Sequence, residues 1–267
     1  MLKQWISQPT LDIQILQERH ASIQFFIRSD GETMVQELRK HLKQIRNIPR
    51  LISKVREHQV TANEWQQLLQ FAYYGIRIGE MLQQCSHLDL PILHKAERIV
   101  ELSTLKKIGS DINNMIDFDQ SSMEDRTIIK KRVDQELDIL KEKYEGLDDF
   151  LLEVAQEIGS EMRLDIAATL NVVYFPQLGF FLTLPQSLGG AALESVQYFF
   201  NFELQFTTAE YVYFKNKRTK DLDEEIGDIH VLIVDKEIEL VQTLAERTLT
   251  YKTILLEMAD VFAELDW

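Results

Sequence analysis

Apolar residues recur at three- and four-residue spacing through most of the first 160 residues, the pattern of amphipathic α-helices. In residues 11–26, for example, Ile13, Leu16, Ile23 and Phe26 fall on one helical side. Proline, glycine and capping residues divide this pattern into separate segments. We therefore predict helices over 11–26, 33–48, 49–58, 62–84, 92–116 and 134–162, with a polar loop over 117–126.

A different pattern occupies residues 165–215, where β-branched and aromatic residues gather. The strands that this pattern predicts are 166–175, 180–184, 198–206 and 211–214. The helical period then resumes at Arg218 and continues almost unbroken toward Trp267, and we expect this run to pack against 134–162 as an antiparallel pair. The predicted fold is mainly α, with one small antiparallel β unit at the end of a helical arm. Such an arm suits gripping a partner at a distance better than enclosing a small substrate.

Composition and charge narrow the classes of protein to which this chain can belong. Only 5 Pro and 10 Gly interrupt 267 residues, which agrees with long helices. The sequence contains no run of 18 uncharged apolar residues, so it predicts no membrane span, and no signal peptide is recognised at the start. Cys85 is the single cysteine, which excludes an internal disulfide, and we therefore expect a reducing, intracellular setting. The net charge of −14 weighs against a free-standing nucleic-acid binder.

The charge is unevenly distributed, however. Residues 221–267 carry 13 acidic and 3 basic side chains, whereas residues 39–56 carry 7 Lys and Arg and no acid. A second basic cluster follows the last predicted strand and consists of Lys215, Lys217, Arg218 and Lys220. The sign of the net charge therefore does not determine the charge of any one surface.

No catalytic apparatus is visible in the sequence. None of the glycines precedes a lysine, so there is no phosphate-binding Walker loop. The six histidines are scattered and lack the spacing of metal ligands. The acidic clusters at 148–149 and 221–225 stand near expected helix starts, where carboxylates favour the positive end of the helix dipole, and we assign them a structural role.

The candidate contact residues lie around the β unit. Lys215, Asn216, Lys217 and Arg218 follow the last strand and either contact phosphates or form a solvated helix entry. Gln177 lies in the turn between the first two strands, which is either a contact tip or a plain hairpin turn. The basic segment 39–56 is expected to face solvent or a partner.

Several motifs together resemble the MutS family of mismatch-repair and recombination proteins, over nearly the whole chain. The opening resembles the start of the family's lever domain, and 47–55 resembles the next short motif. In the β unit, the run Tyr174-Phe175-Pro176-Gln177-Leu178-Gly179-Phe180-Phe181-Leu182 is similar to the strand–turn–strand of the family's clamp. Departures at 47–49, 116–121 and 218–228 resemble the meiotic branch of the family.

The resemblance implies a helical lever over 1–145 and 222–267 and a clamp over 146–221. It implies a parent that acts in the nucleus, pairs with a second MutS homologue and encircles branched DNA such as Holliday junctions to promote crossovers. ATP and Mg²⁺ are implied only for an ATPase domain that follows the lever in family members. We expect this chain to stop before that domain, to hold no cofactor and to be no enzyme by itself.

A second hypothesis, from a different functional class, stays open. The segment 146–220 holds nine acids and five bases, a poor electrostatic case for DNA. The alternative is a structural helical arm whose β tip binds a protein. Salt dependence separates the two, because phosphate contacts give a steep dependence and an apolar protein interface does not.

Overall fold

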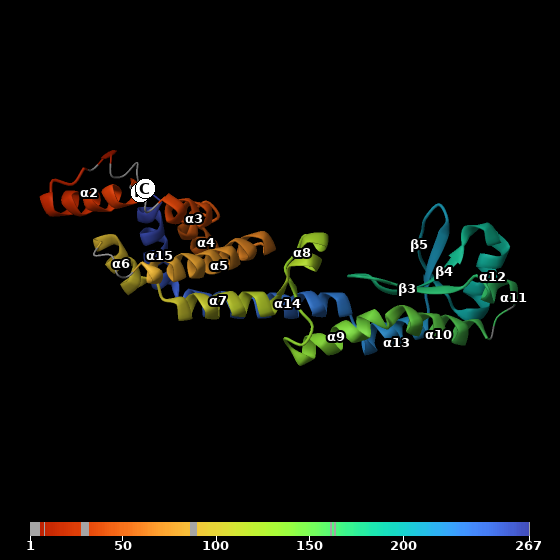
Figure 1. Ribbon diagram of the computed structural model, residues 1–267. Helices are drawn as coiled ribbons and strands as arrows, with labels where there is room; N and C mark the ends of the chain where they lie inside the picture. The colour runs from red at the N-terminus through yellow and green to blue at the C-terminus, as the bar shows by residue number, and fades with distance from the viewer. Residues whose placement is uncertain are drawn as a thin grey trace. The chain divides into compact units, whose positions relative to one another are not determined.

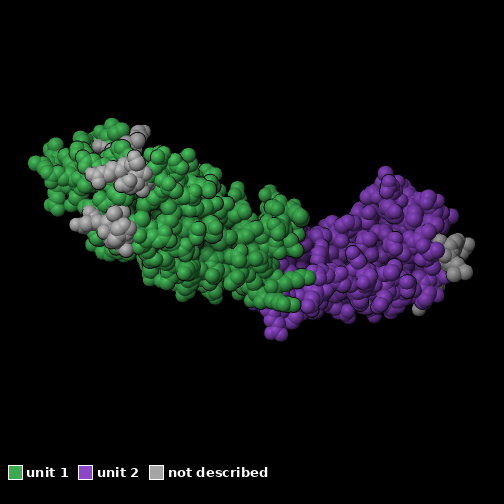
Figure 2. All heavy atoms as spheres, viewed as in Figure 1, with its two compact units in different colours: residues 1–133, 239–267 green, residues 134–238 purple. Residues whose placement is uncertain are grey.

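The computed structural model describes residues 6–7, 9–27, 32–85, 90–160, 162 and 164–266. The described chain is mainly α-helical with two small antiparallel sheets (Figure 1), which confirms the predicted fold class. It forms two compact units, coloured separately in Figure 2: unit 1 is 1–133 with 239–267, and unit 2 is 134–238. The lever and clamp boundaries at 145/146 and 221/222 stay a prediction, because the compact units reflect packing alone.

Unit 1 is helical apart from one pair of two-residue strands. Its elements are α2 (Ile13–Ile27), α3 (Glu32–Leu42), α4 (Ile48–Arg56), α5 (Ala62–Gln84), α6 (Pro91–Ile99), α7 (Leu102–Met115), β1 (Ile116–Asp117), α8 (Phe118–Glu124), β2 (Ile128–Ile129) and α15 (Lys252–Leu265). The helix α14 (Ile229–Leu249) contributes residues to both units.

The long helix α5 forms the centre of unit 1, against α3, α4, α6, α7 and α8. Trp65, Leu68, Phe71 and Ile78 lie along its buried side, each at most 1% exposed. A Cβ atom on Gly79 would lie 2.5 Å from a methyl carbon of Leu102, so the absence of a side chain lets α5 approach the start of α7 closely.

Two predictions in unit 1 were wrong. The single helix expected over 92–116 is two helices, because Val100 and Glu101 adopt extended backbone angles and α6 and α7 each pack on α5. The loop expected over 117–126 contains α8, which Asp117 caps by accepting a hydrogen bond from the Gln120 N–H at 3.0 Å. Local polarity concealed this short helix.

Unit 2 combines paired helices with a four-stranded sheet. Its elements are α9 (Gln135–Glu145), α10 (Leu147–Gly159), α11 (Leu164–Ala167), β3 (Asn171–Phe175), β4 (Gly179–Pro185), the 3-10 turn η2 (Gln186–Leu188), α12 (Gly190–Phe200), β5 (Glu203–Thr207), β6 (Tyr211–Lys215), α13 (Lys217–Glu225) and the first part of α14.

The sheet has the strand order β3-β4-β6-β5, with every neighbouring pair antiparallel. Because side chains alternate across a sheet, one side carries Phe180, Leu182 and Phe214, none of them measurably exposed. The sheet packs on α10 and α13, beside which Figure 1 draws it. The helices α10 and α13, which precede and follow the strands in the sequence, therefore pack against the sheet and complete its core.

The structure also corrects predictions in unit 2. The strand expected over 166–175 begins only at Asn171, and the strand expected over 198–206 begins at Glu203. The aromatic residues at 198–200 predict a strand, but they form the end of α12, and Asn201, with φ +52°, separates that helix from β5. The expected long helices are divided as well, at Gly146, at Gly227 and at 250–251.

A buried ion pair joins α9 to α14 within unit 2. The Nζ of Lys141 lies 2.7 Å from Oε1 of Glu237, and the two side chains are 14% and 2% exposed. A second pair, between Lys236 and Glu136, spans 2.8 Å, but the Glu136 side chain is 70% exposed. Only the first pair removes a carboxylate almost completely from water.

Candidate nucleic-acid interface

The hairpin turn between β3 and β4 has a tight, partly left-handed backbone. The N–H of Leu178 donates to the carbonyl oxygen of Phe175 at 3.1 Å. Gln177 and Gly179 have φ angles of +69° and +88°, in the region where side chains are unfavourable and glycine is not. The turn predicted from Pro176 to Gly179 is therefore present.

Two aspartates that follow the last strand in the sequence hold this turn in place. Asp223, on α13, accepts a hydrogen bond from the Phe180 N–H at 2.9 Å. Asp228, just before α14, accepts one from the Gln177 N–H at 2.6 Å and another from the Tyr174 hydroxyl. The turn is thus bound to the α13–α14 segment and is not a free tip.

The protonation of these groups follows from their contacts. Burial would raise the pKa of Asp228, but hydrogen bonds from the Tyr174 hydroxyl and the N–H groups of Gln177 and Val231 outweigh it and lower that pKa. Burial and the neighbouring Asp228 carboxylate both raise the pKa of Tyr174. At neutral pH a neutral phenol therefore donates to an anionic carboxylate.

This arrangement predicts how stability depends on pH. Because the pKa of Asp228 is lower in the folded than in the unfolded state, its contribution is complete above about pH 4 and is lost as pH falls through the folded-state pKa. We expect Asp228→Asn to lower the free energy of unfolding by about 1–2 kcal/mol at neutral pH and to reduce its fall in acid. Urea unfolding followed by circular dichroism over acidic to neutral pH measures both effects.

Glu210→Gln, at an exposed carboxylate, is the matched control and should leave the acid dependence unchanged. An Asp228→Asn protein with the full acid dependence of the parent would contradict this assignment.

The first two predicted contact residues are engaged within unit 2. Lys215 is 16% exposed at its side chain, forms an ion pair with Asp223 and lies 4.8 Å from the centre of the Phe181 ring. Asn216 caps α13, since its Oδ1 accepts from the Thr219 N–H at 2.9 Å. Any phosphate contact by either residue would compete with these interactions.

The remaining predicted contacts differ in availability. Arg218 is 32% exposed at its side chain and lies 3.5 Å from Glu225 and 3.8 Å from Glu157. Lys217 is exposed, and its side chain has no ion-pair or hydrogen-bond partner in the part of the chain that the structure describes. The structure brings Lys215 to the turn of Gln177, because its Nζ also donates to the Leu178 carbonyl at 3.4 Å. Lys217 is the most available cation of the set.

The sequence of the chain is similar to those of known proteins. The family model described as "MutS domain III" matches residues 1–267. The chain belongs to the MutS family. It is 28% identical to "MutS protein homolog 5" of Saccharomyces cerevisiae, with 100% of this chain and 31% of that protein covered, and 22% identical to the Caenorhabditis elegans protein of the same name, with 99% and 19% covered. It is 23% identical to "DNA mismatch repair protein MSH2" of Arabidopsis thaliana, with 100% and 28% covered.

These matches confirm the resemblance to the MutS family and to its homologue five, which the departures at 47–49, 116–121 and 218–228 indicated. This chain spans about a third or less of each of these relatives. Of the opening motif, Leu2 and Trp5 lie outside the described residues.

One feature of this MutS domain was not singled out from its sequence. Phe175, Phe181, Tyr213 and Phe206 form a continuous row of rings on the sheet side opposite Phe180, with neighbouring centres 4.4–6.0 Å apart. The alternation of aromatic residues along the predicted strands could have revealed it. The row explains how Lys215 is held, since its ammonium group lies over the Phe181 ring.

The described residues offer no group of three or more His, Cys, Asp or Glu side chains placed to hold a metal ion. Among them, no helix has both the length and the apolar content needed to cross a membrane.

Proposed function

We propose that this chain is the lever and clamp portion of a meiotic MutS-like protein, which binds branched DNA such as Holliday junctions in the nucleus and promotes crossovers. The supporting observation is the domain III match over 1–267, together with the similarity to two proteins named MutS protein homolog 5. The partner in this proposal is a second MutS homologue, and the two arms together encircle the duplex. The name of the Arabidopsis relative, which includes DNA mismatch repair, supports DNA as the ligand.

In this proposal unit 2 contacts the phosphate backbone, which positions a protein without reading sequence. Lys217 makes the foremost contact, with Arg218 beside it at the start of α13. Lys215, Asn216 and Gln177 act mainly by fixing the turn and the helix start. ATP and Mg²⁺ would act in an ATPase domain of the parent, and no step in this chain uses them.

The test is a charge reversal at the exposed start of α13. We expect Lys217→Glu with Arg218→Glu to weaken binding of a four-way junction and to reduce the slope of log Kobs against log salt by about 2, since each lost phosphate contact removes roughly 0.9. Fluorescence anisotropy at several salt concentrations, with the full-length protein and its MutS partner, measures both quantities.

The matched control is Lys106→Glu with Lys252→Glu, which reverses two exposed cations in unit 1 and gives the same net charge. Equal binding by the test and control variants would contradict the proposed clamp contact.

A protein-binding tip is the second candidate. Tyr198, Phe199 and Leu204 are 82%, 74% and 52% exposed, and three of the four nearby cations have acidic partners: Lys215, Arg218 and Lys220. Large exposed apolar side chains are typical of protein contacts. Junction binding that is insensitive to salt and to the charge reversals would favour this function.

A further inference from the structure

A second concentration of positive charge lies in unit 1, along α3, the turn after it and the start of α4. Residues 39–56 contain 7 Lys and Arg and no Asp or Glu. Three of these cations have acidic neighbours: Lys40 with Glu37 at 3.8 Å, Arg56 with Glu57 at 3.7 Å, and Lys54 with Glu64. The other four, which we call the basic patch, are Arg39, Lys43, Arg46 and Arg50.

The members of the basic patch are available to a ligand. All four are exposed. Within residues 32–85 and the other described ranges, none of their side chains has an ion-pair or hydrogen-bond partner. Among the described cations around the clamp turn, by contrast, only Lys217 is both exposed and without such a partner. The larger share of available positive charge therefore belongs to unit 1.

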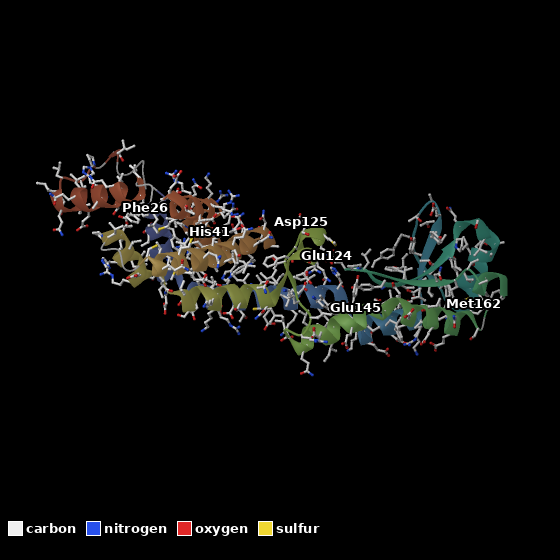
Figure 3. The ribbon with its side chains drawn as sticks, in the orientation of Figure 1. Phe26, His41, Glu124, Asp125, Glu145 and Met162 are labelled. Atoms are coloured by element: carbon white, nitrogen blue, oxygen red, sulfur yellow. The ribbon has the colours of Figure 1, made fainter. Side chains whose placement is uncertain are left out.

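The backbone under the basic patch is fixed. The Lys43 N–H donates to the Arg39 carbonyl at 3.1 Å, which places these two residues one helical turn apart. The side chain of Asn47 accepts a hydrogen bond from the Arg50 N–H at 3.2 Å and caps α4. The inner side of this corner is anchored in the core by Leu38, Leu42, Ile48 and Leu51, each at most 5% exposed. Figure 3 shows nitrogen-tipped side chains extending from α3 and α4 in the region of the labelled His41.

The chemistry of the basic patch fits a polyanion better than a protein surface. Within α3 and α4 no large apolar side chain is exposed, although Tyr73 on the neighbouring helix α5 is 57% exposed and lies beside Tyr74, whose ring centre is 5.7 Å from that of His41. Specific protein interfaces are built around an apolar, often aromatic centre with few charges, whereas α3, the turn after it and the start of α4 present mainly charged side chains. Flexible Lys and Arg side chains on a fixed backbone are instead the means by which proteins neutralise successive phosphates.

We propose that the basic patch is a second contact with the phosphate backbone of duplex nucleic acid, on unit 1 and separate from the clamp. The proposal rests on the proposed function in that it takes DNA as the ligand, but it places most of the electrostatic binding on Arg39, Lys43, Arg46 and Arg50. Four neutralised phosphates account for a salt slope of about 3 to 4, against about 2 from Lys217 and Arg218.

The experiment compares two variants of the full-length protein with its partner, each with four reversals to glutamate and hence the same net charge. The test variant changes Arg39, Lys43, Arg46 and Arg50; the control changes the exposed cations Arg98, Lys106, Lys143 and Lys252. The probe is a fluorescent duplex of random sequence, titrated at several salt concentrations. We expect the test variant to bind at least tenfold more weakly than the control at low salt, with a slope reduced by about 3 to 4.

The outcomes separate this proposal from the proposed function. Equal binding by the test and control variants, with binding still weakened by Lys217→Glu and Arg218→Glu, would overturn the basic patch and leave the clamp contact standing. Loss of binding to the MutS partner with DNA binding equal to the control would also overturn it, in favour of an acidic protein surface. DNA binding that responds to neither set of reversals would sink both proposals.

A milder variant covers the case in which four reversals impair folding. Changing the same four residues to glutamine removes the charge without introducing repulsion, and should lower the salt slope by a similar amount with a smaller loss of affinity. Circular dichroism and the urea midpoint, compared with the control, verify the fold.

Discussion

Replacing Lys141 with methionine should lower the free energy of unfolding by up to about 3–5 kcal/mol, because it removes an ammonium group that pairs with a buried carboxylate. The carboxylate concerned is that of Glu237, whose side chain is 2% exposed and lies 2.7 Å from the lysine ammonium group. The methionine fills much of the volume of the lysine stem, so the loss measures the charge and not a cavity. Urea unfolding followed by circular dichroism gives the value.

Two further variants separate burial from pairing. Lys236→Met breaks a pair whose glutamate, Glu136, is 70% exposed, and should cost less than about 1 kcal/mol. Lys141→Met with Glu237→Leu removes both buried charges and should recover most of the lost stability. Equal losses for the Lys141 and Lys236 variants would contradict the special role of the buried pair.

Gly179→Ala should lower the free energy of unfolding by about 3 kcal/mol, for two reasons that act together. The residue has φ +88°, which is unfavourable for alanine, and the added Cβ would lie 2.2 Å from Oδ1 of Asp223. The carboxylate must move, and with it the hydrogen bond from Phe180 and the ion pair with Lys215. Thermal unfolding of the variant measures the loss.

The double variant Gly179→Ala with Asp223→Ala tests the coupling. It removes the steric conflict but not the backbone strain, so the combined loss should be smaller than the sum of the single losses. Gly190→Ala is the matched control, because its Cβ would meet nothing within 4 Å in the first turn of α12. A neutral Gly179→Ala would show that the turn tolerates another conformation.

The sequence predicted most of the longer helices and the region that contains the sheet, because both depend on a local period, but it missed α8 and the end of α12. It did not predict the break at Val100 and Glu101, which serves the packing of α6 and α7 on α5. It also misassigned Tyr198 and Phe199, since aromatic residues favour strands on average and α12 places them in a helix. At Val100 and Glu101 packing between distant segments decided the local structure, whereas nothing in the structure explains why the exposed Tyr198 and Phe199 are helical.

The contacts of the residues in the candidate site could also be predicted only in part from the sequence. Asp223 was correctly given a structural role, but for the wrong reason: it lies within α13 and holds Phe180, 43 residues earlier in the chain, instead of favouring a helix dipole. Lys215 and Lys217 looked equivalent as neighbouring cations. Only the fold shows that Lys215 lies over a ring beside a carboxylate while Lys217 is exposed.

The two aspartates that hold the β3–β4 turn also set an order for folding during synthesis. Gln177 takes its left-handed conformation with the help of Asp228, which leaves the ribosome 51 residues later. Before α13 is synthesised the turn also lacks Asp223, and its aromatic strands lack the helix on which the sheet packs. Unit 2 therefore completes its fold late, because contacts from a later segment of the chain stabilise the earlier turn. A nascent chain halted before residue 223 would leave its aromatic side chains exposed and prone to aggregation.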